Sequence, residues 1–267
     1  MPISKPTSPL FDALRQPLGV HIVLFQKELA AKSEHLLAHS VSTAELAKYL
    51  VEHTGEAFKI TPHQAFISGL THDVGKLYVS DEILDKNGPL SDRDWDSVKQ
   101  HPSCGASHLS GTVFRAYGAI ALSHHETPDG GGYPCGVKGP NLPNNVRLIA
   151  FADRLAALME DRPYRARIVN FGALCKELRR TADIYFAGDL KRQVIEHSLA
   201  YVGTWLDAQK KVVTYPRKAD RATRGVCREV ELGGPCDGEE LCMEKTSAEL
   251  YASAKSSEGP APERLAA

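Results

Sequence analysis

Long hydrophobic runs are missing from this 267-residue chain. The most apolar stretch near the start, Leu18 to Phe25, extends over about eight residues, whereas a membrane-spanning helix needs about 20. Polar residues at positions 26–28 end it, and no small-residue cleavage pattern follows, so it is also a weak signal peptide. We therefore expect no membrane span.

Cysteine and net charge are also scarce. Six cysteines are too few to form a disulfide framework in a chain of this length, which favours a reducing, cytoplasmic setting. The formal net charge of -1 gives no overall field that would attract nucleic acid or an anionic membrane. We expect no nucleic-acid polymer as a partner, and any anion must bind through local groups.

Sustained alternation of apolar and polar residues, the pattern of a half-buried strand, is absent as well. Apolar residues instead recur at helical spacing, for example over 41–53 and 145–160. We predict an all-α helical bundle over residues 31–208, preceded by a helical extension at 1–30. Residues 209–267, charged, cysteine-containing and rich in small residues, are expected to form a partly disordered extension.

Histidine and aspartate form a series along the predicted helices. His72-Asp73 is followed by His101, by the doublet His124-His125 and by Asp153. Imidazole nitrogen and carboxylate oxygen suit divalent iron, manganese, cobalt, nickel or zinc, and a carboxylate can bridge two such ions. A pair of metals could activate a water and polarise a phosphoryl group. The series therefore predicts a metal cluster.

Most of these residues lie at predicted helix ends. Thr61, with a proline after it, caps a helix that ends at His72-Asp73. A capping box at Ser91 opens a second helix, with Trp95 expected on the inward face and His101 at its end. A site assembled between helices of a bundle requires such positions.

Two motifs carry a resemblance to a known family. Residues 72–76 read HDVGK and residues 124–134 read HHETPDGGGYP. They closely resemble the two signatures of the HD-GYP family, a subclass of the HD metal-dependent phosphohydrolases, and the similarity extends in register from about residue 35 to 200. The resemblance implies an HD-type helical bundle with a metal centre between helices, which hydrolyses the bacterial messenger cyclic di-GMP.

The resemblance also implies roles for individual residues. Asp73 and Lys76 would be catalytic, Asp73 as the bridge between metals and Lys76 as the contact to the scissile phosphate. A metal-bridging hydroxide would open the ring to pGpG, with a second cut to GMP, and the implied cofactors are two divalent ions, iron or manganese. The implied metal ligands are His39, His72, Asp73, His101, His124, His125 and Asp153, and the implied substrate contacts are Lys76, Gly132, Tyr133, Pro134, Arg162 and Arg165.

The chain departs from the family pattern at His35, where members with three metals carry glutamate. Either His35 replaces that carboxylate or the third metal is absent, and we expect two metals. Two alternatives to a cyclic di-GMP phosphodiesterase stay open. One is a hydrolase of another cyclic dinucleotide or nucleotide; the other is a weakly active signalling adaptor that binds nucleotide or protein partners. A homodimer is also compatible with the sequence.

Overall fold

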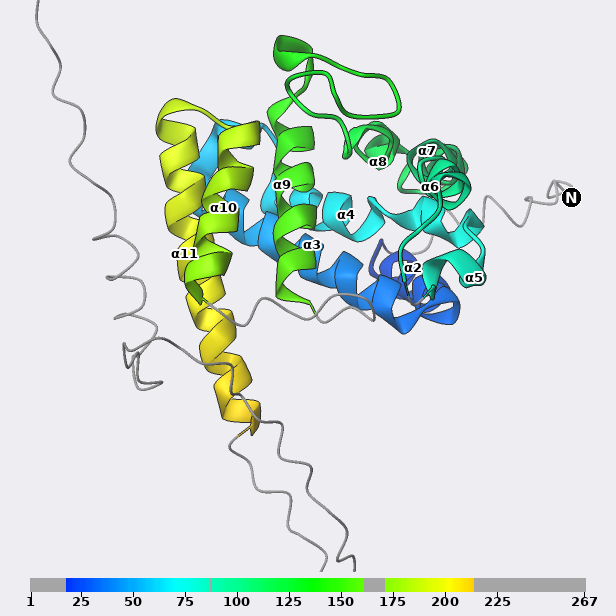
Figure 1. Cartoon of the computed structure of the whole chain (residues 1–267), viewed down its shortest axis with the longest axis horizontal. Helices are drawn as coiled ribbons and strands as arrows, with labels where there is room; N and C mark the ends of the chain where they lie inside the picture. Colours follow the sequence, from blue (N-terminus) through cyan, green and yellow to red (C-terminus); the bar gives the residue numbers. More distant parts are fainter. Residues whose placement is uncertain (1–17, 87, 161–170, 214–267) are drawn as a thin grey trace, which may run out of the picture. The chain divides into compact units, whose positions relative to one another are not determined.

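The computed structural model describes residues 18–86, 88–160 and 171–213, and within these ranges the chain is helical and contains no strand (Figure 1). This confirms the predicted all-α class. The α-helices are α2 (Leu18–Lys32), α3 (Glu34–Thr54), α4 (Pro62–Thr71), α5 (Asp81–Leu84), α6 (Asp92–Val98), α7 (His101–Ser110), α8 (Gly118–Ser123), α9 (Asn144–Met159), α10 (Phe171–Tyr185) and α11 (Gly188–Val213). Short 3-10 helices are η1 (Gly55–Phe58), η2 (Val74–Tyr78), η3 (Arg115–Tyr117) and η4 (Gly139–Asn141).

Helix α3 packs against both α4 and α9 at the centre of the first unit (Figure 1). The contact with α4 is close because Gly69 has no side chain: a methyl group there would lie 2.6 Å from the Cα atom of Ala44. Large apolar side chains such as Leu50, Ile67 and Leu155 are fully buried around this contact. Their close packing fixes the relative position of the three helices.

Helix α7 packs against α8 and η2, and here too a glycine permits the contact. A methyl group on Gly75 would overlap the carbonyl oxygen of His101 and lie 2.6 Å from the nitrogen of Gly105. The start of α7 is thereby held directly beside the segment that follows α4.

The predicted cap at Thr61 and the predicted capping box at Ser91 are both present, and Thr61 also forms a capping box. Thr61 and Gln64 exchange hydrogen bonds of 2.9 and 3.2 Å at the start of α4, and Ser91 caps α6 in the same way. The prediction for Trp95 is wrong, because its side chain is 45% exposed. His101 does not end α6 either: α6 stops at Val98, and His101 opens α7. Proline at the next position favours a new helix start there.

The chain divides into two compact units, residues 1–198 and 199–267, and the structure describes only residues 199–213 of the second. The predicted domain boundaries at residues 30 and 208 fall within α2 and α11, and they stay predictions. The rest of the predicted C-terminal extension, 214–267, lies outside the described residues. Among the helices that the structure describes, none combines the length and apolar character that crossing a bilayer requires.

Candidate metal centre

His72 and Asp73 stand at the junction between α4 and η2. His72 caps α4, and its Nδ1 atom donates a hydrogen bond of 2.6 Å to the carbonyl oxygen of Gly69. Both side chains are buried, at 0 and 1% exposure. The Nε2 atom of His72 and the Oδ1 atom of Asp73 have no hydrogen-bond partner within the described chain. Two buried polar atoms without a partner indicate that an ion or a ligand binds at this position.

His101 and His124 repeat the arrangement of His72. Their Nδ1 atoms donate to the carbonyl oxygens of Val98 and Ala121, at 2.6 and 2.7 Å, in each case three residues earlier. Since a carbonyl can only accept, Nδ1 carries a proton in both rings, and a neutral ring then has its lone pair on Nε2. The two Nε2 atoms lie 3.2 Å apart, a distance at which two lone pairs repel unless a proton or a cation lies near both.

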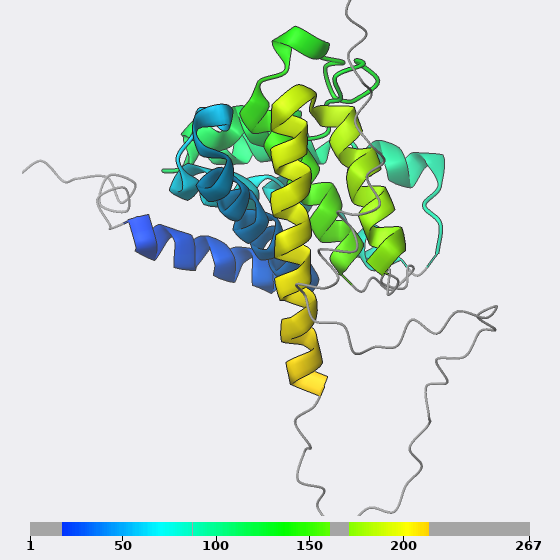
Figure 2. The same cartoon turned by 90° about the vertical axis from the view of Figure 1, so that its left-hand side faces the viewer.

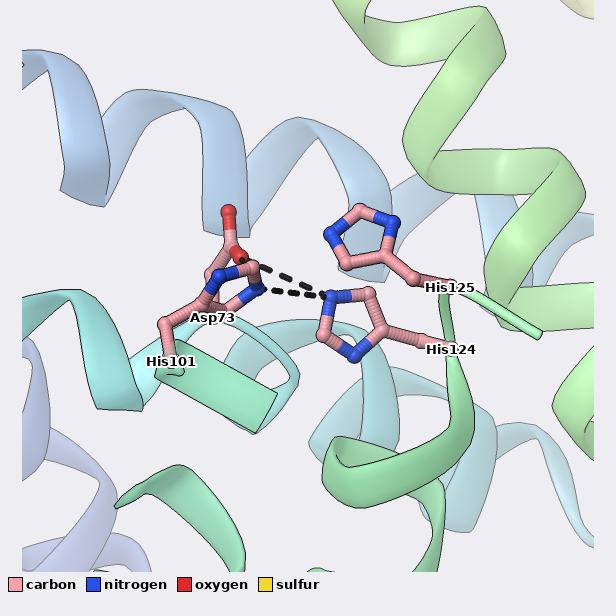
Figure 3. A group of neighbouring side chains, drawn as sticks. All are labelled: Asp73, His101, His124 and His125. Carbon is pink, nitrogen blue, oxygen red and sulfur yellow. Dashed lines mark hydrogen bonds and ion pairs between the residues drawn. The ribbon is translucent and has the colours of Figure 1, made fainter. Parts of the chain in front are cut away.

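The carboxylate of Asp73 lies between two sets of histidines. Its Oδ1 atom is 3.2 Å from Nε2 of His101 and 3.6 Å from Nε2 of His124. Figure 3 shows these three side chains together. Its Oδ2 atom is 3.3 Å from Nε2 of His72 and 3.6 Å from Nε2 of His39. Each oxygen therefore faces different nitrogen donors, which is the arrangement of a carboxylate that bridges two cations.

Helices α3 and α9 complete the cluster. Nε2 of His39, from α3, lies 2.9 Å from Oδ1 of Asp153, from α9, and that oxygen is 3.8 Å from Nε2 of His72. His125 lies beside the His124 ring, with ring centroids 4.1 Å apart (Figure 3). Donor atoms within 4.8 Å of one another form three groups: Asp73, His101, His124 and His125; His39, His72 and Asp73; His72, His124 and Asp153. Together the groups contain all seven predicted ligands.

The histidines of this cluster have opposed pKa shifts. Burial acts to lower the pKa of His72, but the charge of Asp73 outweighs it and raises that pKa to about 10. Burial also acts on His39, whose pKa is nevertheless raised by hydrogen bonds to Asp153 and Glu160. Burial lowers the pKa of His124 to about 4. His72 is therefore cationic at neutral pH in the metal-free protein, whereas His124 is neutral.

The carboxylates shift in the complementary direction. Burial acts to raise the pKa of Asp73, but the charges of Lys76 and His72 outweigh it and hold that pKa well below its usual range. The hydrogen bond from His39 and the charge of His72 do the same for Asp153 against its burial. The buried cluster thus retains two negative charges that require nearby positive charge. Imidazole and carboxylate donors of this kind, with buried atoms left unpaired, fit divalent metal ions.

Lys76 and the loop between α8 and α9 lie against this cluster. Nζ of Lys76 is 2.5 Å from Oδ2 of Asp73.

The loop between α8 and α9 projects beyond the helix ends in both Figure 1 and Figure 2. Within it the Tyr133 ring stacks on His125, with centroids 4.7 Å apart and an angle of 26° between the planes. Gly132 permits this, because a methyl group there would lie 2.5 Å from the Cα atom of Glu126. Pro134, joined by a cis peptide bond, is exposed.

Two carboxylates near the site were not predicted from the sequence. Glu126 is fully buried, and its carboxylate accepts hydrogen bonds from the backbone N–H groups of residues 135, 136 and 137 at 2.6, 3.1 and 2.9 Å. Glu160 places Oε2 3.0 Å from Nδ1 of His39. The available signals were the position of Glu126 directly after His124-His125 and the seven-residue step from Asp153 to Glu160, which puts both on one helix face.

One residue that was considered as a possible ligand is not brought into the cluster. His35 is exposed and belongs to none of the three donor groups. Arg162 and Arg165 lie outside the described residues.

Comparison with known proteins places the chain in a family. The family model described as "HD domain" matches residues 24–188. The 3'3'-cGAMP-specific phosphodiesterase 1 of Vibrio cholerae is 34% identical over 60% of this chain and 38% of its own length. A cyclic di-GMP phosphodiesterase of Vibrio cholerae is 34% identical over 59% of this chain and 32% of its own length. The chain thus spans about a third of the curated relatives it matches. From the match over 24–188, the chain belongs to the HD domain family.

Proposed function

We propose that this chain is a metal-dependent phosphodiesterase that hydrolyses cyclic di-GMP. The observation that carries the proposal is the Asp73 carboxylate, whose two oxygens face separate sets of histidine nitrogens at 3.2–3.6 Å. Relatives named as cyclic di-GMP or cGAMP phosphodiesterases support a cyclic dinucleotide as the substrate.

The donor groups favour two divalent ions, and we propose iron or manganese because imidazole and carboxylate ligands suit both. His101, His124 and His125 would hold one ion together with Asp73, and His39, His72 and Asp153 would hold the other. When bound, the two ions would activate a water and polarise the phosphoryl group. The exposed position of His35 supports two ions over three.

Lys76 would offer a positive charge to the phosphate. Its ammonium group lies beside Asp73 and its side chain is 23% exposed, so it can contact both the centre and a ligand from solvent. A fixed positive charge there stabilises negative charge that develops on phosphoryl oxygens. The ring would open to pGpG, and a second cut would give GMP.

The loop over the centre would contact the nucleotide. Tyr133, stacked on His125, presents a partly exposed aromatic ring against which a base or ribose can pack, with Gly132 and Pro134 beside it. Arg162 and Arg165 stay proposed contacts to the nucleotide. 3'3'-cGAMP is a second candidate substrate, because one of the relatives is named for it.

Turnover tests this proposal. Protein loaded anaerobically with Fe²⁺ or Mn²⁺ is incubated with cyclic di-GMP or 3'3'-cGAMP, and the products are separated by chromatography. We expect pGpG from cyclic di-GMP and no turnover by Asp73→Ala, with exposed Asp96→Ala as the control of wild-type activity. Wild-type activity in Asp73→Ala would show the site to be wrong. Two bound metals without turnover of either substrate would favour the adaptor.

A further inference from the structure

Glu160 directly follows α9, the helix that carries Asp153. The two residues are seven positions apart, about two helical turns, so Glu160 follows α9 on the side that carries Asp153. Both side chains contact His39 of α3. The Glu160 side chain is 14% exposed, and its Oε1 atom is buried without a hydrogen-bond partner among the residues that the structure describes. Its Oε2 atom lies 3.0 Å from Nδ1 of His39. The side chain is therefore directed at this histidine.

The His39 ring is held at both nitrogens by carboxylates. Nδ1 contacts Glu160, while Nε2 lies 2.9 Å from Asp153 and 3.6 Å from Asp73. His72 differs, because its Nδ1 donates to a backbone carbonyl, as do the Nδ1 atoms of His101 and His124. A carbonyl is neutral, whereas the carboxylate of Glu160 brings a full negative charge to the far side of the His39 ring.

We propose that Glu160 is a positioning residue for His39, which fixes its ring and strengthens Nε2 as a metal ligand. A carboxylate behind a ligating histidine fixes the Nδ1 proton, orients the ring and increases the basicity of the opposite nitrogen. The inference rests on the metal-binding part of the proposed function and does not depend on the substrate.

The two halves of the centre are consequently unequal. The group of His39, His72 and Asp73 is supported by a side-chain carboxylate, whereas His101 and His124 are supported by backbone carbonyls that no substitution removes. Changing Glu160 should weaken the binding of one metal equivalent and leave the other unchanged.

Metal binding by Glu160→Ala and Glu160→Gln tests this. Mn²⁺ affinity and stoichiometry are measured by equilibrium dialysis, and Co²⁺ loading is followed by visible absorption. Glu52→Gln is the control, since Glu52 lies on α3 and its ion pair with Lys48 is exposed. We expect Glu160→Ala to weaken one of two equivalents by about 10- to 100-fold and to change the Co²⁺ spectrum. Glu160→Gln should have a smaller effect, because its amide oxygen still accepts from Nδ1.

Two results for Glu160→Ala would contradict its proposed role as a positioning residue. Wild-type affinity for both equivalents in Glu160→Ala would show that Glu160 has no effect on His39 as a ligand. Equal weakening of both equivalents would indicate general loosening of the site. Failure of the wild-type protein to bind two equivalents would instead contradict the proposed function, from which the inference starts.

Discussion

Asp73 is the residue on which the account depends most. A buried carboxylate is unfavourable unless it is paired, and this one has Lys76 on one oxygen and histidine nitrogens around both. Its Oδ2 atom contacts Lys76 and also faces the His39 and His72 pair, so a cation there would compete with the lysine for the same oxygen.

Metal binding should release a proton from His72. The pKa of His72 is about 10, so its ring carries two protons at pH 7.5, and the lone pair at Nε2 forms only when one of them leaves. We expect about one proton released from His72 at this pH and an affinity that rises with pH toward 10. His124, with a pKa of about 4, contributes none.

Calorimetric titration with Mn²⁺ in buffers of different ionisation enthalpy measures this release. Binding heats that do not depend on the buffer would contradict the raised pKa of His72.

The raised pKa of His72 also affects stability. The metal-free protein gains stability from protonated His72 at pH below about 6.5, and it loses this stability as the pH rises through about 10.

Glu126 should matter for both stability and substrate binding. Its carboxylate accepts three backbone N–H groups of the loop that carries Tyr133. In Glu126→Gln the amide NH₂ group faces one of those donors, so we expect a loss of about 2 kcal/mol in the free energy of unfolding. Urea denaturation measures this, with exposed Glu45→Gln as the control. An unchanged unfolding midpoint would mean that the loop does not depend on Glu126.

The sequence could predict the metal-binding residue types but not the side chains that support them. His, Asp and Lys in matched motifs predicted the donor cluster that the structure assembles. Glu126 and Glu160 act through hydrogen bonds to a loop backbone and to a histidine 121 residues away, and no local pattern reveals such contacts. The position of His35 depends on the orientation of α3, which spacing alone does not determine.

At the scale of elements, the site is made where helices end. His72 caps α4, His124 caps α8, and His101 opens α7. The cap and proline signals at Thr61 predicted the start of α4 correctly, since they are local. Such signals failed at His101. The seven-residue helix α6 ends at Val98 and α7 begins at His101, whereas the sequence pattern predicted one helix that ends at His101.

Gly75 tests the contact between η2 and α7. In Gly75→Ala the new methyl group would overlap the His101 carbonyl, so α7 must move, and we expect a loss of about 3 kcal/mol in the free energy of unfolding. Gly111→Ala is the matched control, with φ of -88° and no atom within 4 Å of an added methyl group. Denaturant unfolding of both variants measures this loss. Equal free energies of unfolding for the two variants would exclude the close contact between Gly75 and His101.

At the scale of the molecule, the first unit holds the whole donor cluster, and separate segments supply its parts: α3, α9 and the ends of α4, α7 and α8. A site built this way forms only when the bundle is folded, which couples metal binding to folding. The all-α class followed from the sequence because helical periodicity is local. The packing of α3 on α4 and α9 did not, since it depends on tertiary contacts such as that of Gly69 with Ala44.

The most direct test of the central claim is anomalous diffraction from crystals of the protein loaded with Mn²⁺ or Fe²⁺. The account predicts two anomalous peaks with the Asp73 carboxylate between them, one ligated by His101, His124 and His125 and the other by His39, His72 and Asp153. A single peak, or two peaks of which only one contacts Asp73, would contradict it.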